Sequence, residues 1–166
     1  MKTPKAFDLK AHNATWYSWA DIDECFWPGA GRRSSKVNEV LAEVVKAKGV
    51  YCIAWKPKGE VAPTNKSVRY IGQTNLFKRR MEQFGWSAGF WDGRDSGHSA
   101  GWRWPAGRKK DMAVAFFPLQ GDGLGAHMIE GFLHWYEALA MEAHFQKNNC
   151  ELPRLNAQKK GVISLD

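Results

Sequence analysis

The sequence predicts an α+β fold, in which a small three-stranded antiparallel sheet is flanked by helices. Three observations lead to this prediction. Some segments carry apolar residues at helical spacing, short runs between them are rich in β-branched and aromatic residues, and loops with glycine and proline separate the two kinds. The expected order along the chain is helix, strand, strand, helix, strand, helix, which is typical of helices packed against an antiparallel sheet.

A helix is predicted over about residues 35–48, because apolar residues recur there at spacings of three and four (Val37, Val40, Leu41, Val44 and Val45). A second, shorter helix is expected to end at Phe84, since Gly85 follows and glycine commonly closes helices. A long helix is expected over about residues 126–147, and Pro153 stops any helix beyond it.

Three strands are predicted between these helices, over residues 49–55, 68–73 and 112–119. The first two are expected to pair as a hairpin, joined by a loop over residues 56–67 that contains two prolines and a glycine. The stretch over residues 85–110 has no periodicity and is rich in glycine, tryptophan and arginine, so we expect a long loop there.

Length and composition are those of a globular domain with a short extension: 166 residues, 44% of them apolar and 25% charged. We place the N-terminal extension at residues 1–48 and the domain at residues 49–166. No apolar run approaches the ~20 residues that span a bilayer, and the N-terminus leads into no apolar signal segment. A cytoplasmic protein with no membrane partner is therefore expected. Three widely separated cysteines favour neither a disulfide framework nor structural zinc.

The net charge is positive, with 24 Lys and Arg residues against 17 Asp and Glu, or +7 in total. Small basic proteins often bind polyanions, because contacts with phosphates dominate such affinity. Charge alone does not single out one function, so the motifs decide between the possibilities.

Two tripeptides mark the predicted hairpin, Gly-Val-Tyr at residues 49–51 and Tyr-Ile-Gly at residues 70–72. Arg80 follows eight positions after the second glycine, on the short helix. Glu142 lies on the long helix, and a Pro-x-x-Asn that ends at Asn156 follows it. In this order, the four elements resemble the GIY-YIG nuclease family.

The resemblance implies an endonuclease that depends on Mg²⁺ (or Mn²⁺) and hydrolyses the phosphodiester bonds of DNA. It also implies a role for each matching residue. Tyr51 would be the general base, Tyr70 would position the water or the phosphate, and Arg80 would stabilise the transition state. Glu142 would hold the metal ion, and Asn156 would order the site.

Each of these residues also has a structural interpretation. Tyr51 and Tyr70 could be strand tyrosines in the sheet core. Arg80 could lie solvated over an apolar helix face, an interpretation that suits its neighbour Arg79 better. Glu142 could pair with a lysine or arginine, since a carboxylate among apolar residues costs free energy unless it is paired or bound to metal.

The chain departs from the family pattern in three places within the matched range, about residues 49–156. Phe84 stands one turn after the arginine, where many members have a His or Tyr, and phenylalanine cannot transfer a proton. His98, in a glycine-containing loop, could supply that capacity. The loop between the tripeptides is longer than is usual, and Gln73 stands where some repair members have a lysine.

The stretch over residues 85–110 interleaves aromatic and basic residues, a pattern that can stack on bases and hold a phosphate backbone. The residues expected to contact nucleic acid are Arg79, just before this stretch, and Trp102, Arg103, Arg108 and Lys109. The alternative is that the aromatic residues form a small satellite core that fixes a long loop. The two roles do not exclude each other.

A competing pattern lies on the long helix, where His127, Glu130, His134, Glu137, Met141 and His144 share one face. Such a stripe could bind a transition metal. A metal site in a helical bundle needs ligands from a second helix, however, and no other predicted helix offers them. A solvated polar face is the simpler interpretation.

The first hypothesis is therefore a divalent-metal-dependent DNA endonuclease of GIY-YIG type. The second is a non-catalytic nucleic-acid-binding module that retains the fold, and Phe84 is the feature that favours it. The third is a metalloprotein that uses the His/Glu stripe.

Overall fold

The computed structural model describes residues 14–26, 36–91, 97–105, 107–119 and 125–157. They form an α+β fold around a four-stranded antiparallel sheet in the order β1-β4-β2-β3. Three strands are the predicted ones: β2 (Gly49–Trp55), β3 (Val68–Thr74) and β4 (Met112–Pro118). The expected number of three is wrong by one, because β1 (Tyr17–Ser18) pairs with the outer side of β4. A strand of two residues has no alternation from which it could be predicted.

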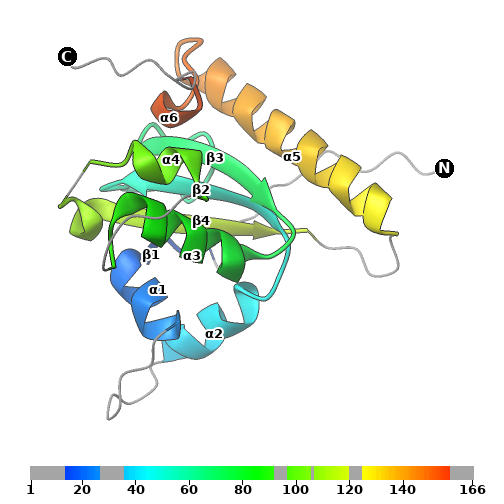
Figure 1. Ribbon diagram of the computed structural model, residues 1–166. Helices are drawn as coiled ribbons and strands as arrows, with labels where there is room; N and C mark the ends of the chain where they lie inside the picture. Colours follow the sequence, from blue (N-terminus) through cyan, green and yellow to red (C-terminus); the bar gives the residue numbers. More distant parts are fainter. Residues whose placement is uncertain (1–13, 27–35, 92–96, 106, 120–124, 158–166) are drawn as a thin grey trace.

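Helices cover both faces of the sheet (Figure 1). The helices are α1 (Trp19–Phe26), α2 (Lys36–Val44), α3 (Phe77–Ala88), α4 (Ser99–Trp102), α5 (Ala126–Lys147) and α6 (Arg154–Ala157). Helices α3 and α4 lie in front of the sheet in Figure 1, and α1 and α2 lie beside them. Helix α5 has the predicted bounds and packs on the other face against β2 and β3. None of the helices in the described ranges is long and apolar enough to span a bilayer.

The sheet separates two apolar clusters, and β2 contributes to both. Its residues Tyr51 and Ile53 pack toward α3, whereas Val50, Cys52 and Ala54 pack toward α5. Because both faces of β2 are buried, the strand is apolar throughout rather than alternating.

The segment before residue 49 shares this core. Trp19 of α1 and Leu41 of α2 are buried in the same cluster as Tyr51, so the packing is continuous across residue 48. The start of α3 is also tied to this segment, since the amides of Phe77 and Lys78 donate to the carbonyls at residues 47 and 45.

Helix α3 runs past the end predicted at Phe84 and finishes at Ala88, so that prediction is wrong. A Cβ at Gly85 would lie 2.7 Å from the Trp91 ring and 2.9 Å from the Trp19 ring. The glycine therefore allows two tryptophans to pack against the helix rather than ending it. The capping residue is Gly89, whose φ of 69° is the left-handed conformation common after helices.

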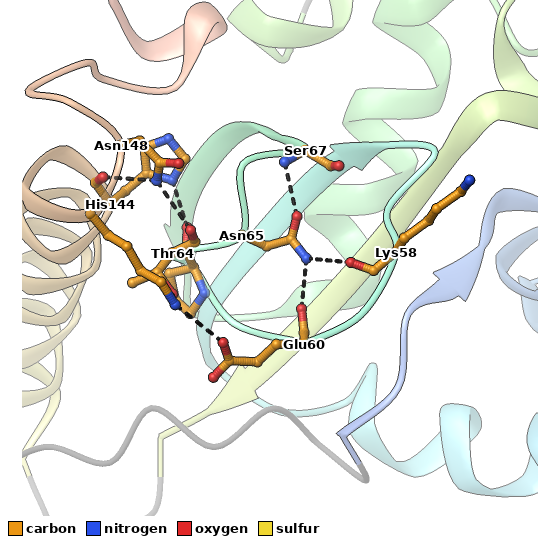
Figure 2. A network of polar contacts seen from close by, with 9 residues as sticks. Lys58, Glu60, Thr64, Asn65, Ser67, His144 and Asn148 are labelled. Carbon is orange, nitrogen blue, oxygen red and sulfur yellow. Dashed lines mark hydrogen bonds and ion pairs between the residues drawn. The ribbon is translucent and has the colours of Figure 1, made fainter.

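The loop over residues 56–67 is ordered by one asparagine (Figure 2). The Asn65 Nδ2 donates to the carbonyls of Lys58 at 3.0 Å and Glu60 at 2.8 Å. Its Oδ1 accepts from the Ser67 amide at 2.9 Å. The loop lies outside the helices and strands, and the Asn65 side chain hydrogen-bonds to three of its backbone groups.

The same loop is held against the end of α5, and we call these residues the loop anchor: Pro63, Thr64, His144 and Asn148. The His144 Nδ1 lies 2.7 Å from the Pro63 carbonyl oxygen, and Asn148 Nδ2 donates to the Thr64 carbonyl at 3.1 Å. Figure 2 shows these side chains reaching from the helix to the loop. His144 thus has a structural partner, and one of its two ring nitrogens is used to hold the loop.

Candidate active site

The side chains of Tyr51, Tyr70 and Arg80 meet on the α3 side of the β2–β3 hairpin. The register pairs Tyr51 with Gly72 and Ile53 with Tyr70, so both tyrosines project from the same face of the sheet. Their ring centroids are 6.0 Å apart. The Arg80 Nε donates to Tyr51 Oη at 3.2 Å, and Arg80 also hydrogen-bonds to Tyr70. Three of the five predicted catalytic residues are therefore neighbours in space.

Gly72 makes this arrangement possible. A Cβ at this position would lie 2.7 Å from Tyr51 Oη and 2.6 Å from Tyr70 Cε1. Both tyrosines therefore lean over the glycine backbone, and any side chain there would displace them. The second tripeptide has a glycine at its end because two phenol rings occupy the space above it.

His98 completes the group, which we call the phenol cluster: Tyr51, Tyr70, Arg80 and His98. It does not lie in an exposed loop, because the residue is only 1% exposed. Its Nε2 lies 2.6 Å from Tyr51 Oη. The ring also packs at 5.1 Å against Phe84, the residue that lacks a proton to transfer. The histidine beside Tyr51 therefore comes from the residue before α4, and not from the Phe84 position on α3.

The chemical state of Tyr51 follows from its surroundings. Burial raises the pKa of the Tyr51 phenol well above its ordinary value of 10, and the neighbouring Tyr70 raises it further, while Arg80 acts in the opposite direction. Tyr51 is therefore a neutral phenol at physiological pH in the free protein.

Arg80 connects the phenol cluster to a cleft of about 610 Å³ between α3 and the first half of α5. Its Nη1 donates to Gln83 Oε1 at 3.0 Å and to the Gly97 carbonyl at 3.3 Å. Among the described residues that line the cleft, three are cationic (Lys48, Arg79 and Arg80) and one is acidic (Glu130). The cleft therefore suits an anionic ligand, with a guanidinium held rigidly in its wall.

The glutamate of α5 within electrostatic reach of Arg80 is Glu137, whereas the predicted one was Glu142. Burial raises the pKa of Glu137, and His134, Arg80 and the Gln73 amide lower it again. Glu142 is exposed, and it accepts a hydrogen bond from Gln146 Nε2 at 2.6 Å.

Helix geometry explains the difference between the two glutamates. At 3.6 residues per turn, a separation of five residues turns a side chain by about 140°. Leu133, Ala140 and His144 are the buried residues of α5, and Glu137 falls on their face. It lies where the outer edge of β3 offers the Gln73 amide as a donor. The structure therefore does not bring Glu142 together with Tyr51 and Arg80.

Asn156 binds the outer edge of β3 rather than a catalytic side chain. Its Oδ1 accepts from the Ile71 amide, and its Nδ2 donates to the Ile71 carbonyl, both at 2.8 Å. This pair of bonds replaces a neighbouring strand and fixes the backbone next to Tyr70. The predicted ordering role of Asn156 is therefore a backbone contact.

The basic and aromatic residues predicted to contact nucleic acid are divided between core and surface. Arg79 is exposed at the cleft, and Trp102 is 46% exposed. Arg103 donates to the Leu155 carbonyl at 2.6 Å.

The two remaining members of this set are paired with carboxylates. Arg108 forms an ion pair with Asp111, and Lys109 forms one with Asp23. Trp104, within the same stretch, is buried in the main core. The aromatic residues Phe90, Trp91 and Trp104 of this stretch therefore belong to the main core rather than to a separate satellite core. Arg79, Trp102 and Arg108 are the exposed members of the predicted DNA contacts, and Arg108 is paired with Asp111.

The donor set at the site suits a cation that prefers oxygen ligands, such as Mg²⁺ or Mn²⁺. Within the described ranges, no group of three or more His, Cys, Asp or Glu side chains is placed to bind a metal. Zinc sites in proteins use three or four such ligands. Mg²⁺ takes oxygen ligands and keeps several waters, so a single carboxylate such as Glu137 can hold it beside an anionic substrate.

The sequence interpretation did not assign two groups to this site: Glu137, which it placed in the His/Glu stripe, and the Gln73 backbone amide. The signal for Glu137 was present, because it lies four residues after Leu133 and three before Ala140, both on the buried face of α5. The Gln73 amide has no side-chain signal, since it depends on β3 being an edge strand.

Comparison with known proteins gives no relative of this chain. No protein-family model matches it, and it matches neither a curated protein nor a solved structure at a significant level.

Proposed function

We propose that this protein is an endonuclease that hydrolyses phosphodiester bonds in DNA with the help of Mg²⁺ or Mn²⁺. The observation that carries the proposal is the hydrogen bond from Arg80, which lines a cationic cleft, to the buried Tyr51. Glu137 on α5 lies within electrostatic reach of the same guanidinium. The order of the motifs in the sequence, and their resemblance to GIY-YIG nucleases, adds to it. We propose DNA as the partner and the cytoplasm as its location.

Phosphodiester hydrolysis needs charge neutralisation at phosphorus, a nucleophilic water and help for the leaving oxygen. Arg80 is suited to the first task, because its planar guanidinium can hold two phosphate oxygens and its orientation is fixed by Gln83 and Gly97. Tyr51 accepts the Arg80 Nε–H, so an arriving phosphate and the phenol oxygen would lie on one guanidinium.

Glu137 would hold the metal ion, with water completing its coordination. When bound, a divalent ion neutralises phosphate charge and lowers the pKa of its water. Lys48 and Arg79 would contact neighbouring phosphates along the cleft, because both line it and the charge there is predominantly positive.

The experiment is a nicking assay on supercoiled, single-stranded and branched DNA with Mg²⁺, with Mn²⁺, and with EDTA as the control. We expect nicking of at least one substrate that requires the metal and stops with EDTA. Absence of cleavage on all substrates with both metals contradicts the proposal.

A specific observation favours the second candidate, a nucleic-acid-binding module without catalysis. The Tyr51 side chain is fully buried, and its pKa is raised well above 10, which opposes a role as base. Phe84, one turn after Arg80, is also fully buried. Binding of DNA in a mobility-shift assay, combined with no cleavage in the nicking assay, identifies this function instead.

A further inference from the structure

His98 is held in one orientation by contacts on every side. Its backbone amide donates to Ser87 Oγ at 3.0 Å, and its ring packs at 5.1 Å against both Phe84 and Tyr70. The Ala100 amide donates to its Nδ1 at 3.2 Å, and its Nε2 faces Tyr51 Oη at 2.6 Å.

These contacts determine which ring nitrogen carries the proton. A backbone amide can only donate, so the Nδ1 that faces Ala100 must be the accepting nitrogen. A neutral imidazole then has its hydrogen on Nε2, directed at Tyr51. A hydrogen on Nδ1 would instead face the hydrogen of the Ala100 amide. The neutral ring suits its surroundings, since burial and the positive charges of Arg80 and Arg103 lower the pKa of His98 to about 3.

We propose that His98 is a permanent hydrogen-bond donor to the Tyr51 oxygen and does not accept the Tyr51 proton. Its part is that of a positioning residue. The Tyr51 oxygen then accepts from His98 Nε2 and from Arg80 Nε, and its own hydrogen is directed to its remaining polar neighbour, Tyr70. The same two donors stabilise a negative charge on that oxygen whenever the proton leaves.

This assignment differs from a proton-transfer role for His98, which would need a free lone pair at Nε2. The groups that face the ring are Tyr51 from β2, Tyr70 from β3, Arg80 from α3 and Arg103 after α4. None of them is an anion at neutral pH, so none favours a charged imidazole. The catalytic consequence rests on the proposed nuclease function, whereas the position of the proton does not.

The first test uses NMR of the full chain labelled with ¹⁵N-histidine, between pH 5 and pH 9. Five histidines are present, and the signal lost in His98→Gln assigns the one of interest. We expect Nε2 of His98 to be protonated, Nδ1 to be unprotonated, and neither shift to change over this range. A protonated Nδ1, or a titration near pH 6.5, overturns the proposal whether or not the protein cleaves DNA.

The second test compares His98→Ala with His98→Gln in the nicking assay as a function of pH. Glutamine places an amide N–H near the position of Nε2 but cannot act as a base. We expect the alanine variant to lose about tenfold or more in nicking rate, and the alkaline limb of its pH–rate profile to shift to higher pH. The glutamine variant should recover most of the lost rate. Folded glutamine and alanine variants with equal losses contradict a donor role. If the wild-type chain itself cleaves nothing, the proposed function fails and the NMR result alone decides the position of the proton.

Discussion

Two buried histidines, His98 in the phenol cluster and His144 in the loop anchor, use the same ring in opposite ways. They are 1% and 4% exposed. The Nδ1 of His144 faces the Pro63 carbonyl, which only accepts, so this nitrogen carries the hydrogen. The Nδ1 of His98 faces the Ala100 amide, which only donates, so it carries none.

The two histidines differ in what their hydrogen bonds fix, a loop in one case and a side chain of the candidate site in the other. The hydrogen bond of His144 ends in the backbone of a loop, and its effect is to hold that loop on α5. The second nitrogen of His98 reaches a hydroxyl that Arg80 also contacts, at the wall of a cationic cleft. Burial and residue type are the same in both regions, and the partner group is what differs. We therefore expect changes in the phenol cluster to affect activity and changes in the loop anchor to affect stability.

The largest effect is expected from Arg80→Ala in the phenol cluster. Loss of a preorganised charge at a developing anion costs about 100- to 1,000-fold in rate, and we expect a loss of this size in metal-dependent nicking. The matched control is Arg79→Ala, which removes an exposed charge on the same cleft and should mainly weaken DNA binding in a salt-dependent way. Equal losses in the two folded variants contradict the special position of Arg80.

In the loop anchor, His144→Ala tests the other side of the comparison. It removes a buried hydrogen bond and leaves the Pro63 carbonyl unpaired, which should lower the free energy of unfolding by about 1–3 kcal/mol. Urea unfolding measures this loss, and the nicking rate per folded molecule should be unchanged. A variant that keeps its stability but loses activity reverses the distinction between the two regions.

Acid stability gives a third test, which depends on His98. Its pKa falls from an ordinary 6.5 to about 3 on folding, so the unfolded chain binds the extra proton. Above pH 6.5 the ring is neutral in both the folded and the unfolded chain, so it does not oppose folding. As the pH falls from 6.5 toward 3, the free energy of unfolding decreases by up to about 1.4 kcal/mol per pH unit. We expect His98→Gln to flatten this slope in urea unfolding at several pH values. An unchanged slope means that His98 is not the group responsible.

The smallest effect is expected from Asn156→Asp. Asn156 holds backbone, as the loop anchor does, but it does so beside Tyr70 of the phenol cluster. The carboxylate can still accept from the Ile71 amide but would face the Ile71 carbonyl with no hydrogen to donate. We expect a loss of about 1 kcal/mol in urea unfolding and a smaller loss of activity than for Arg80→Ala. A variant as stable as the wild type would contradict a stabilising role for the contact between Asn156 and Ile71.

Much of the fold could be predicted because its strands and its long helix have strong local patterns. Strand β2 and helix α5 have their expected bounds, and the tyrosines share a face because strand side chains alternate. The end of α3 was misplaced because Gly85 serves a contact with Trp19 and Trp91, which lie far apart in the chain. A local rule for glycine cannot include such a contact.

The site was predictable where residues are fixed by regular structure and not where tertiary contacts place them. Tyr51 and Arg80 were selected by the resemblance to the GIY-YIG motifs, and the phase of β2 and α3 brings their side chains together. His98 depends on α4 approaching α3, where Gly101 lies so close to Ser87 that a Cβ would be 2.7 Å from it. Glu142 was selected by the resemblance to the family's glutamate-containing segment, whereas the phase of α5 places Glu137 on the buried face of the helix.

The most direct test of the proposed nuclease site compares the rates of Mg²⁺-dependent nicking by Glu137→Gln and by Glu142→Gln. Glutamine keeps the size of each side chain and removes only its charge, and both positions lie on the same helix. The account predicts a loss of at least about 100-fold for Glu137→Gln and wild-type activity for Glu142→Gln. Wild-type activity in Glu137→Gln, or the loss in Glu142→Gln instead, contradicts it.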